Sequence, residues 1–196
     1  METQPDRDCV RIMGIDPGSR TLGISITNCF PYEQQLSLID AWTLHTDQHL
    51  RLKRFRADRV GEHQVRLEAI EEEVFQALEN FYPDVVIMET PYLGRLPQSF
   101  FVLTQVMTAI GRAVQRYSAA MYLDKIDPAT VKKTIGVPGN SSDKELVRQA
   151  VNALPNLENL SERTLESLDE HAIDSIAVTH YYCVSELGLE WKKPSC

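Results

Sequence analysis

The sequence has no long apolar run. No stretch approaches the roughly 20 consecutive apolar residues that a membrane helix needs, so no membrane association is expected. The N-terminal residues METQPDRD are polar and acidic, which is typical of neither a secretion signal nor a transit peptide. The chain therefore has the composition of an ordinary soluble enzyme or binding protein.

Cysteine is scarce and scattered. The four cysteines are Cys9, Cys29, Cys183 and Cys196, and none belongs to a C-x-x-C pair, which argues against a zinc site. In a chain without a secretion signal, isolated cysteines favour a reducing compartment, where they act as small apolar side chains.

Nucleotide-binding loops are missing too. Neither a Walker A loop nor a G-x-G-x-x-G fingerprint is present. The residues GIDPG at 14–18 resemble the first strand and turn of actin-like ATPases, but such a protein needs a second phosphate loop for which 196 residues leave no room. No nucleotide cofactor is expected.

Positive charge is in short supply. The chain has 20 Lys and Arg against 28 Asp and Glu, a net charge of −8, which argues against a passive nucleic-acid coat. It does not exclude an enzyme that gathers carboxylates around metal ions and keeps a local basic surface. Such a surface is present in residues 51–66, where six basic residues face two acids.

The apolar pattern predicts one α/β domain over residues 1–196, with a folded core of approximately 10–187 and a mixed five-stranded sheet flanked by helices. The expected strands are residues 10–16, 22–28, 36–43, 84–90 and 119–126. The expected helices are residues 61–80, 98–117, a short segment that Asp127 caps, 142–153 and 168–187. The basic residues 44–61 show weak periodicity and are interpreted as a loop.

Three acidic residues lie at the ends of predicted strands or on the last predicted helix, where they can meet in one site. Asp16 and Glu89 each end an apolar strand, and Asp174 lies on the last helix one turn after His171. A carboxylate beside a core needs a cation, a donor or exposure. Adjacent strand ends covered by this helix would bring the acids together, and Mg²⁺ would relieve their repulsion. Each residue alone also has an ordinary explanation: a turn residue, a surface acid and a solvated helix face.

The motifs around these acids resemble the RuvC family of Holliday junction resolvases, which have a ribonuclease-H-like fold. The matching segments are RIMGIDPGSRTLGISI (11–26), DVVIMETPYLG (84–94), DPATVKKTIGVPGNSSDKELVRQAV (127–151) and EHAIDSIAVTHYY (170–182). They cover most of the chain, and the first and last are specific by themselves.

The resemblance implies a site and an activity. The family's catalytic and metal-binding positions correspond to Asp16, Glu89, His171 and Asp174, with His171 either a metal ligand or the general base for the attacking water. The implied cofactor is Mg²⁺, for which Mn²⁺ is expected to substitute. The implied enzyme is a crossover junction endodeoxyribonuclease that works as a homodimer, in the cytoplasm of a bacterial or phage-infected cell, or in an organelle matrix if a transit peptide was trimmed.

The resemblance also implies DNA contacts. Tyr92 corresponds to an aromatic near the junction centre, Lys132 and Lys144 correspond to phosphate contacts, and Lys133 and Arg148 are neighbouring candidates. The segment 44–62 is longer and more basic than is usual for the family. We expect it to touch a DNA arm through Arg51, Lys53, Arg54 and Arg56.

Two alternatives for the function stay open at this stage. The enzyme could be a broader branched-DNA nuclease that cuts flaps or forks, or the chain could bind junctions without cutting them. The helix over 98–117 is the expected dimer interface, through Phe100, Phe101, Leu103 and Val106, although such a cluster is more often core.

Overall fold

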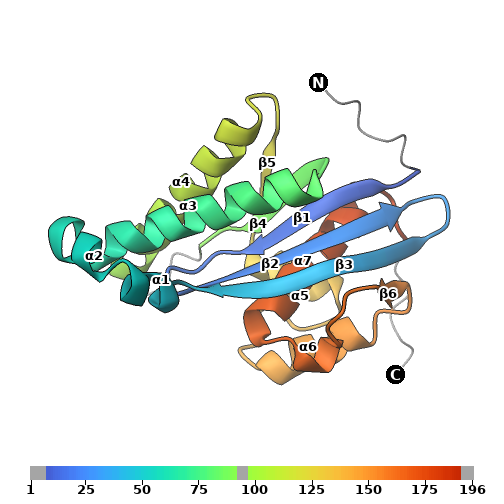
Figure 1. Ribbon diagram of the computed structural model, residues 1–196. Coiled ribbons are helices and arrows are strands. Elements are labelled where there is room, and N and C mark those ends of the chain that lie inside the picture. The colour runs from blue at the N-terminus through green and yellow to red at the C-terminus, as the bar shows by residue number, and fades with distance from the viewer. Residues whose placement is uncertain (1–7, 92–96, 191–196) are drawn as a thin grey trace.

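The computed structural model describes residues 8–91 and 97–190 (Figure 1). Its strands are β1 Val10–Asp16, β2 Thr21–Phe30, β3 Gln35–His45, β4 Val85–Glu89, β5 Leu123–Ile126 and β6 Leu157–Asn159. Its helices are α1 Thr46–Leu52, α2 Arg54–Val60, α3 Glu62–Phe81, α4 Pro97–Tyr117, α5 Pro128–Thr134, α6 Lys144–Asn152 and α7 Glu170–Ser185, with a 3₁₀ turn at Leu165–Ser167.

The strands form one mixed sheet in the order β5-β4-β1-β2-β3-β6. β1, β2 and β3 are consecutive antiparallel neighbours, whereas β4 lies parallel to β1 and β5 parallel to β4. The expected mixed α/β sheet is therefore confirmed, but the count of five strands was wrong. The sixth strand, β6, is only three residues long and pairs in parallel with β3, which is too short to leave a periodic pattern.

Two cores cover the two faces of the sheet. On β1, Ile12 faces the core made with α5, α6 and α7, while Met13 and Ile15 face the core made with α3 and α4. Figure 1 shows the same arrangement, with α3 and α4 on one side of the strands and α5 to α7 on the other. The alternation follows from the period of two along a strand.

The interpretation of residues 44–61 as a loop was wrong for most of that segment. Residues 46–60 form the short helices α1 and α2, which we call the α1–α2 lobe. Buried Arg66 of α3 holds this lobe, because it donates to Thr46 Oγ1 at 2.8 Å and pairs with Asp47 Oδ1 at 2.6 Å. Arg56 of α2 pairs with Glu68 of α3 in the same way, through two bonds of 2.7 and 2.6 Å.

Capping residues begin the later helices as the sequence indicates. Asp127 accepts from the Thr130 amide at the start of α5, which confirms the predicted cap. Asp169 accepts from the amides of His171 and Ala172 and so begins α7. None of the described helices is both long and apolar enough to cross a membrane.

Candidate functional site

The four predicted site residues lie at one edge of the sheet. Parallel pairing of Ile15 with Met88 puts the next residue of each strand, Asp16 and Glu89, at the same carboxyl edge. α7 packs over this edge and carries His171 and Asp174 one turn apart. The strand-end and helix-face placements inferred from the sequence are thus found together.

Two glycines let α7 come this close. A Cβ on Gly14 would stand 2.5 Å from the Ser175 carbonyl oxygen and 2.5 Å from Thr179 Cγ2. A Cβ on Gly23 of β2 would overlap the backbone of His171 itself. Because neither clash can be relieved by turning a side chain, these two positions set the depth at which His171 meets Asp16.

His171 is held from both ring nitrogens. Its Nδ1 lies 2.8 Å from Asp16 Oδ2, and its Nε2 lies 2.8 Å from the Thr21 hydroxyl. The bond to Asp16 raises the pKa of His171 against the effect of burial. A nearby carboxylate of this kind favours the imidazolium, and the Thr21 hydroxyl can accept from Nε2–H in that state.

Thr21 was not singled out from the sequence. It begins β2, and its partner is 150 residues away, so no local pattern marks it. The same is true of Thr43 on β3, whose hydroxyl donates to Asp169 at the start of α7 at 2.5 Å. The β2–β3 hairpin therefore fixes the N-terminal turn of α7 through hydroxyl contacts.

Asp174 is engaged by a lysine. Lys144 Nζ donates to Asp174 Oδ2 at 2.6 Å, and the Asp174 side chain is only 13% exposed. Burial raises the pKa of Asp174, and the ammonium of Lys144 opposes this only in part. Burial disfavours the charged ammonium of Lys144, but the hydrogen bond to Asp174 and the negative charges of the nearby acids together outweigh that effect and raise the Lys144 pKa.

Glu89 is the most perturbed of the acids. Burial, then the negative charges of Asp16 and Asp174, raise the pKa of Glu89 to about 8. An acid with that pKa is largely protonated at neutral pH unless a cation compensates it. A pKa shift of this size, caused by burial and by two neighbouring carboxylates, marks Glu89 as a candidate functional residue.

The side chains as they stand do not form a metal cage. Within residues 8–91 and 97–190, no group of three or more His, Cys, Asp and Glu side chains is placed to hold one ion. Asp16 is turned toward His171 and Asp174 toward Lys144. The three carboxylates are nevertheless near one another, because the strand register sets Asp16 beside Glu89 and the contact of His171 with Asp16 brings Asp174, one turn further along α7, to the same place. The negative charges of Asp16 and Asp174 accordingly raise the pKa of Glu89.

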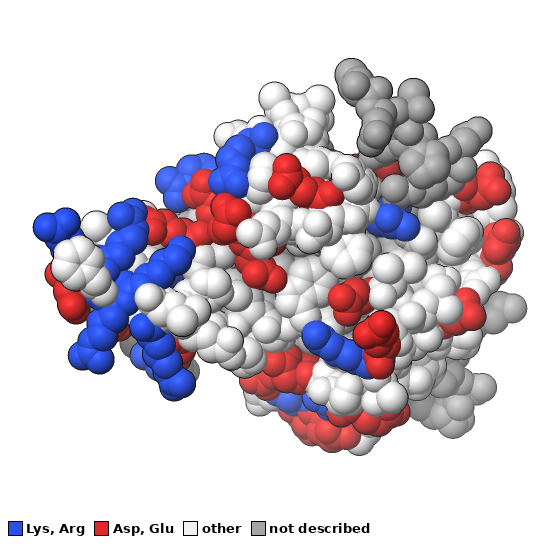
Figure 2. Space-filling model, in the orientation of Figure 1, with Lys and Arg blue, Asp and Glu red and all other residues white. Residues whose placement is uncertain are grey.

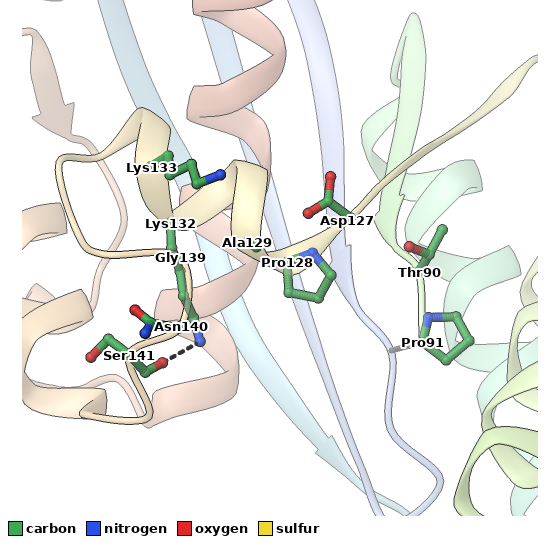
Figure 3. A pocket seen from close by; sticks show the side chains of 10 residues that line it. All are labelled: Thr90, Pro91, Asp127, Pro128, Ala129, Lys132, Lys133, Gly139, Asn140 and Ser141. Carbon is green, nitrogen blue, oxygen red and sulfur yellow. Dashed lines mark hydrogen bonds between the residues drawn. The ribbon is translucent and has the colours of Figure 1, made fainter. Parts of the chain in front are cut away.

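A hollow of about 930 Å³ opens beside Thr90 and Pro91, the two residues that follow Glu89 in the sequence (Figure 3). It is lined by the residues just after β4 (Thr90, Pro91), the start of α5 (Asp127–Ala129), Lys132, Lys133 and residues 139–141. Figure 3 shows Lys132 bonded to the Ser141 carbonyl, a distance of 2.8 Å, and Lys133 on the same helix. Two of the predicted DNA contacts therefore border a cavity next to the acids.

The other predicted DNA contacts have different surroundings. Arg148 has a side chain 24% exposed and bonds to the Leu165 carbonyl oxygen at 3.3 Å, so it contacts the 3₁₀ turn Leu165–Ser167 of its own chain. Tyr92 lies outside the described residues. Arg51, Lys53, Arg54 and Arg56 are exposed on the α1–α2 lobe, where Figure 2 shows Lys and Arg gathered at one end of the molecule.

The predicted dimer helix is only partly available. Phe101 is 63% exposed on α4, and Phe100 and Leu103 are partly exposed. Val106, however, is completely buried in the core with α3 and cannot touch a partner. The expectation for Val106 was wrong, since α4 turns that face toward the sheet.

Comparison with known proteins gives a consistent picture. The family model for "Crossover junction endodeoxyribonuclease RuvC" matches residues 12–180. The RuvC protein of Geobacter sulfurreducens is 29% identical over 153 residues, which are 78% of this chain and 84% of that protein. The RuvC protein of Christiangramia forsetii is 28% identical over 177 residues, covering 87% of this chain and 79% of that protein.

Two solved structures share the fold. T. thermophilus RuvC, in complex with a Holliday junction substrate, superposes with a TM-score of 0.63 at 19% identity, over 91% of this chain and 98% of that chain. The yeast mitochondrial Holliday junction resolvase superposes with a TM-score of 0.61 at 14% identity, over 88% of this chain and 77% of that chain.

Proposed function

The chain belongs to the RuvC family of crossover junction endodeoxyribonucleases, and we propose that it cuts four-way DNA junctions with Asp16, Glu89, His171 and Asp174 as its catalytic set. The observation that supports this assignment most strongly is the convergence of three carboxylates, one of them with a pKa of about 8, at a single sheet edge. Clustered carboxylates of this kind cost folding free energy. Perturbed acids in such clusters are therefore found mainly at functional sites.

The donor set fits a hard divalent cation. Three carboxylates, those of Asp16, Glu89 and Asp174, supply the oxygen ligands that Mg²⁺ and Mn²⁺ prefer. A bound cation would offset the repulsion that raises the pKa of Glu89, and it would compete with Lys144 for Asp174. Mg²⁺ is the proposed cofactor. When bound there, such ions polarise the phosphate and lower the pKa of a coordinated water.

The chain's own residues orient the attack. Asp16 and Thr21 hold the two ring nitrogens of His171, so the imidazole has one orientation at the edge. We propose that His171 in its neutral form, with Nδ1–H donated to Asp16 and Nε2 released from Thr21, accepts the proton of the attacking water at Nε2. The products would be a 5′-phosphate and a 3′-hydroxyl, formed as water adds to phosphorus and the 3′-oxygen leaves.

Basic residues beside the acids would bind the substrate backbone. Lys132 and Lys133 line the hollow next to Glu89, and Lys144 reaches the acids themselves. Such cations neutralise phosphates and set the position of the scissile bond. On the other side of the edge, Arg51, Lys53 and Arg54 of the α1–α2 lobe would hold a DNA arm. Arg56 is already paired with Glu68, so it is less available to bind a phosphate than the other three.

Two sites are needed for paired cuts, so we propose a homodimer. A four-way junction has approximate two-fold symmetry, which a two-fold dimer matches. The exposed part of α4 around Phe101 and Leu103 is the proposed contact. Phe101→Glu should give a monomer by sedimentation and unpaired nicks in the junction, whereas an unchanged dimer would place the contact elsewhere.

The central test is cleavage of a labelled synthetic four-way junction in Mg²⁺, beside a flap, a Y-fork and a linear duplex. Wild type should nick the junction symmetrically, and Asp174→Asn should bind it without cutting. Equal cutting of flaps and forks would favour a broader branched-DNA nuclease. Tight junction binding without any cutting in Mg²⁺ or Mn²⁺ would mean that the acids are structural.

A further inference from the structure

The α1–α2 lobe carries three large apolar side chains at its surface. Leu52 is 85% exposed, Phe55 is 75% exposed and Val60 is 44% exposed. A single exposed apolar residue needs no explanation. These three lie within residues 52–60, and none of the seven residues of α2, all of them described, is buried. Packing within the chain therefore does not account for them.

The lobe does not need these side chains to stay in place. Polar contacts attach it to α3, through Arg66 to Thr46 and Asp47 in α1, and through Arg56 to Glu68 in α2. Arg66 and Thr46 are buried, so the bond between them is screened from water and is worth more than a surface contact, whereas the pair with the more exposed Asp47 is a weaker second attachment. The apolar residues are consequently presented outward from an anchored support.

The surroundings of the apolar residues are cationic. Arg51, Lys53 and Arg54 are exposed and form no ion pair with any residue of the described ranges. The Arg59 guanidinium stands over the Phe55 ring, 5.0 Å from its centroid. Arg59 covers one face of the ring, and the high exposure of Phe55 leaves the other face open. A cationic rim around an open aromatic face suits a polyanion that also offers flat rings.

The lobe also starts at the catalytic edge, by which we mean the sheet edge that carries Asp16, Glu89, His171 and Asp174. Thr46 follows His45, which pairs with Thr21, and Thr21 contacts His171. The Thr46 amide in turn donates to the Arg20 carbonyl, in the loop after Asp16. A seven-residue helix is about 10 Å long, so Phe55 is on the order of 10–20 Å from the acids. That span corresponds to about three to six nucleotide steps of a DNA strand.

We infer that Phe55, flanked by Leu52, stacks on a DNA base close to the branch point, while Arg51, Lys53 and Arg54 hold the neighbouring phosphates. This inference rests on the proposed junction cleavage, and it identifies an unpaired base near the branch point as the part of the junction that the lobe contacts. Cations alone would suffice for a contact to phosphates. The open ring needs a base face, which a continuous duplex hides and a branch point offers at lower cost.

The test uses full-length protein and a four-way junction with 2-aminopurine at single positions three to six nucleotides from the cut, in Ca²⁺ to prevent cleavage. Wild type should change the fluorescence at one or two of these positions. Phe55→Ala should abolish that change and weaken junction affinity about 5- to 150-fold, the range for losing one stacked base. Phe55→Trp should restore both.

A matched control is Tyr122→Ala, which removes an aromatic residue of 81% exposure before β5. Lys53→Ala/Arg54→Ala should lower affinity and the salt dependence while keeping the fluorescence change. If Phe55→Ala behaves like Tyr122→Ala in both signals, the inference is overturned. It is equally overturned if Phe55→Ala converts a dimer to a monomer, because the ring would then face protein. Wild-type cutting of the same junction in Mg²⁺ is measured in parallel, so absence of cutting counts against the proposed function alone.

Discussion

The catalytic edge and the α1–α2 lobe are built in opposite ways. At the edge, the acids lie partly or largely buried, and the charge of Glu89 in particular is poorly compensated. On the lobe, basic and apolar side chains point into solvent, and none of the described residues of α2 is buried. The edge can change the chemistry of a phosphate because its charges are held in a low dielectric. The lobe can only add or remove binding energy.

This difference predicts that variants of the two regions separate turnover from affinity. Edge variants should lose rate at saturating DNA, and lobe variants should lose affinity with an unchanged rate. Lobe variants keep the wild-type rate only if the lobe does not also position the scissile bond.

The largest effect is expected for Glu89→Gln. Loss of one member of a catalytic set should lower the single-turnover rate in Mg²⁺ by roughly 10²- to 10⁴-fold. Junction affinity in Ca²⁺ should stay equal or improve, because a negative group near the phosphates is removed. Asp124→Asn, a substitution in the middle of β5, serves as the control. A variant that cuts at the wild-type rate would remove Glu89 from the catalytic set.

The acids could be located from the sequence because their signal is local. Asp16 and Glu89 each close an apolar strand, and the spacing of His171 and Asp174 is one helical turn. The lobe was misread because α1 buries only Thr46 and α2 buries nothing, so neither leaves an apolar stripe. The ion pairs that hold these helices join α1 and α2 to α3, and their geometry is visible only in the fold.

A second effect concerns the lobe itself. Arg51→Ala/Lys53→Ala/Arg54→Ala should weaken junction binding about tenfold at low salt, and the slope of log K against log salt should become less negative by about 2–3, since each phosphate contact contributes about 0.9. The rate at saturating junction should not change. Arg112→Ala/Arg116→Ala removes two arginines of α4 that pair with glutamates of α3, and it is the control. A fall in the saturated rate would show that the lobe also positions the cut.

A smaller loss of rate is expected at Thr21, which acts through His171. Thr21→Val keeps the shape of the side chain but removes the hydrogen bond to His171 Nε2. The rate at saturating junction should fall about tenfold, the lower end of the loss when a residue that orients a site side chain is removed. Thr21→Ser retains a hydroxyl and should keep most of the rate. Affinity for the junction should be the same for both. Equal rates for the valine and serine variants would show that the hydroxyl does not position the ring.

The smallest effect is on stability, and it follows from the pKa of about 8 for Glu89. The folded state holds this proton more tightly than the unfolded chain, whose Glu titrates near its ordinary value of 4.5. Stability from this group is therefore complete below about pH 4.5 and declines as pH rises through about 8. Glu89→Gln lacks this decline, so without divalent ions its Tm should fall less than that of wild type between pH 5 and pH 9.

The expected gap is several degrees at pH 9, since about 1 kcal/mol moves Tm by about 2–4 °C in a domain of this size. Mg²⁺ should close the gap by stabilising wild type, because a ligand that binds only the folded state raises its stability. The measurement is thermal unfolding of both proteins in EDTA and in Mg²⁺ across this pH range. Parallel profiles in EDTA would mean that Glu89 is ionised and well compensated in the folded protein. The charge of Glu89 would then be balanced by its surroundings without a metal ion, and uncompensated charge would no longer distinguish the edge from the lobe.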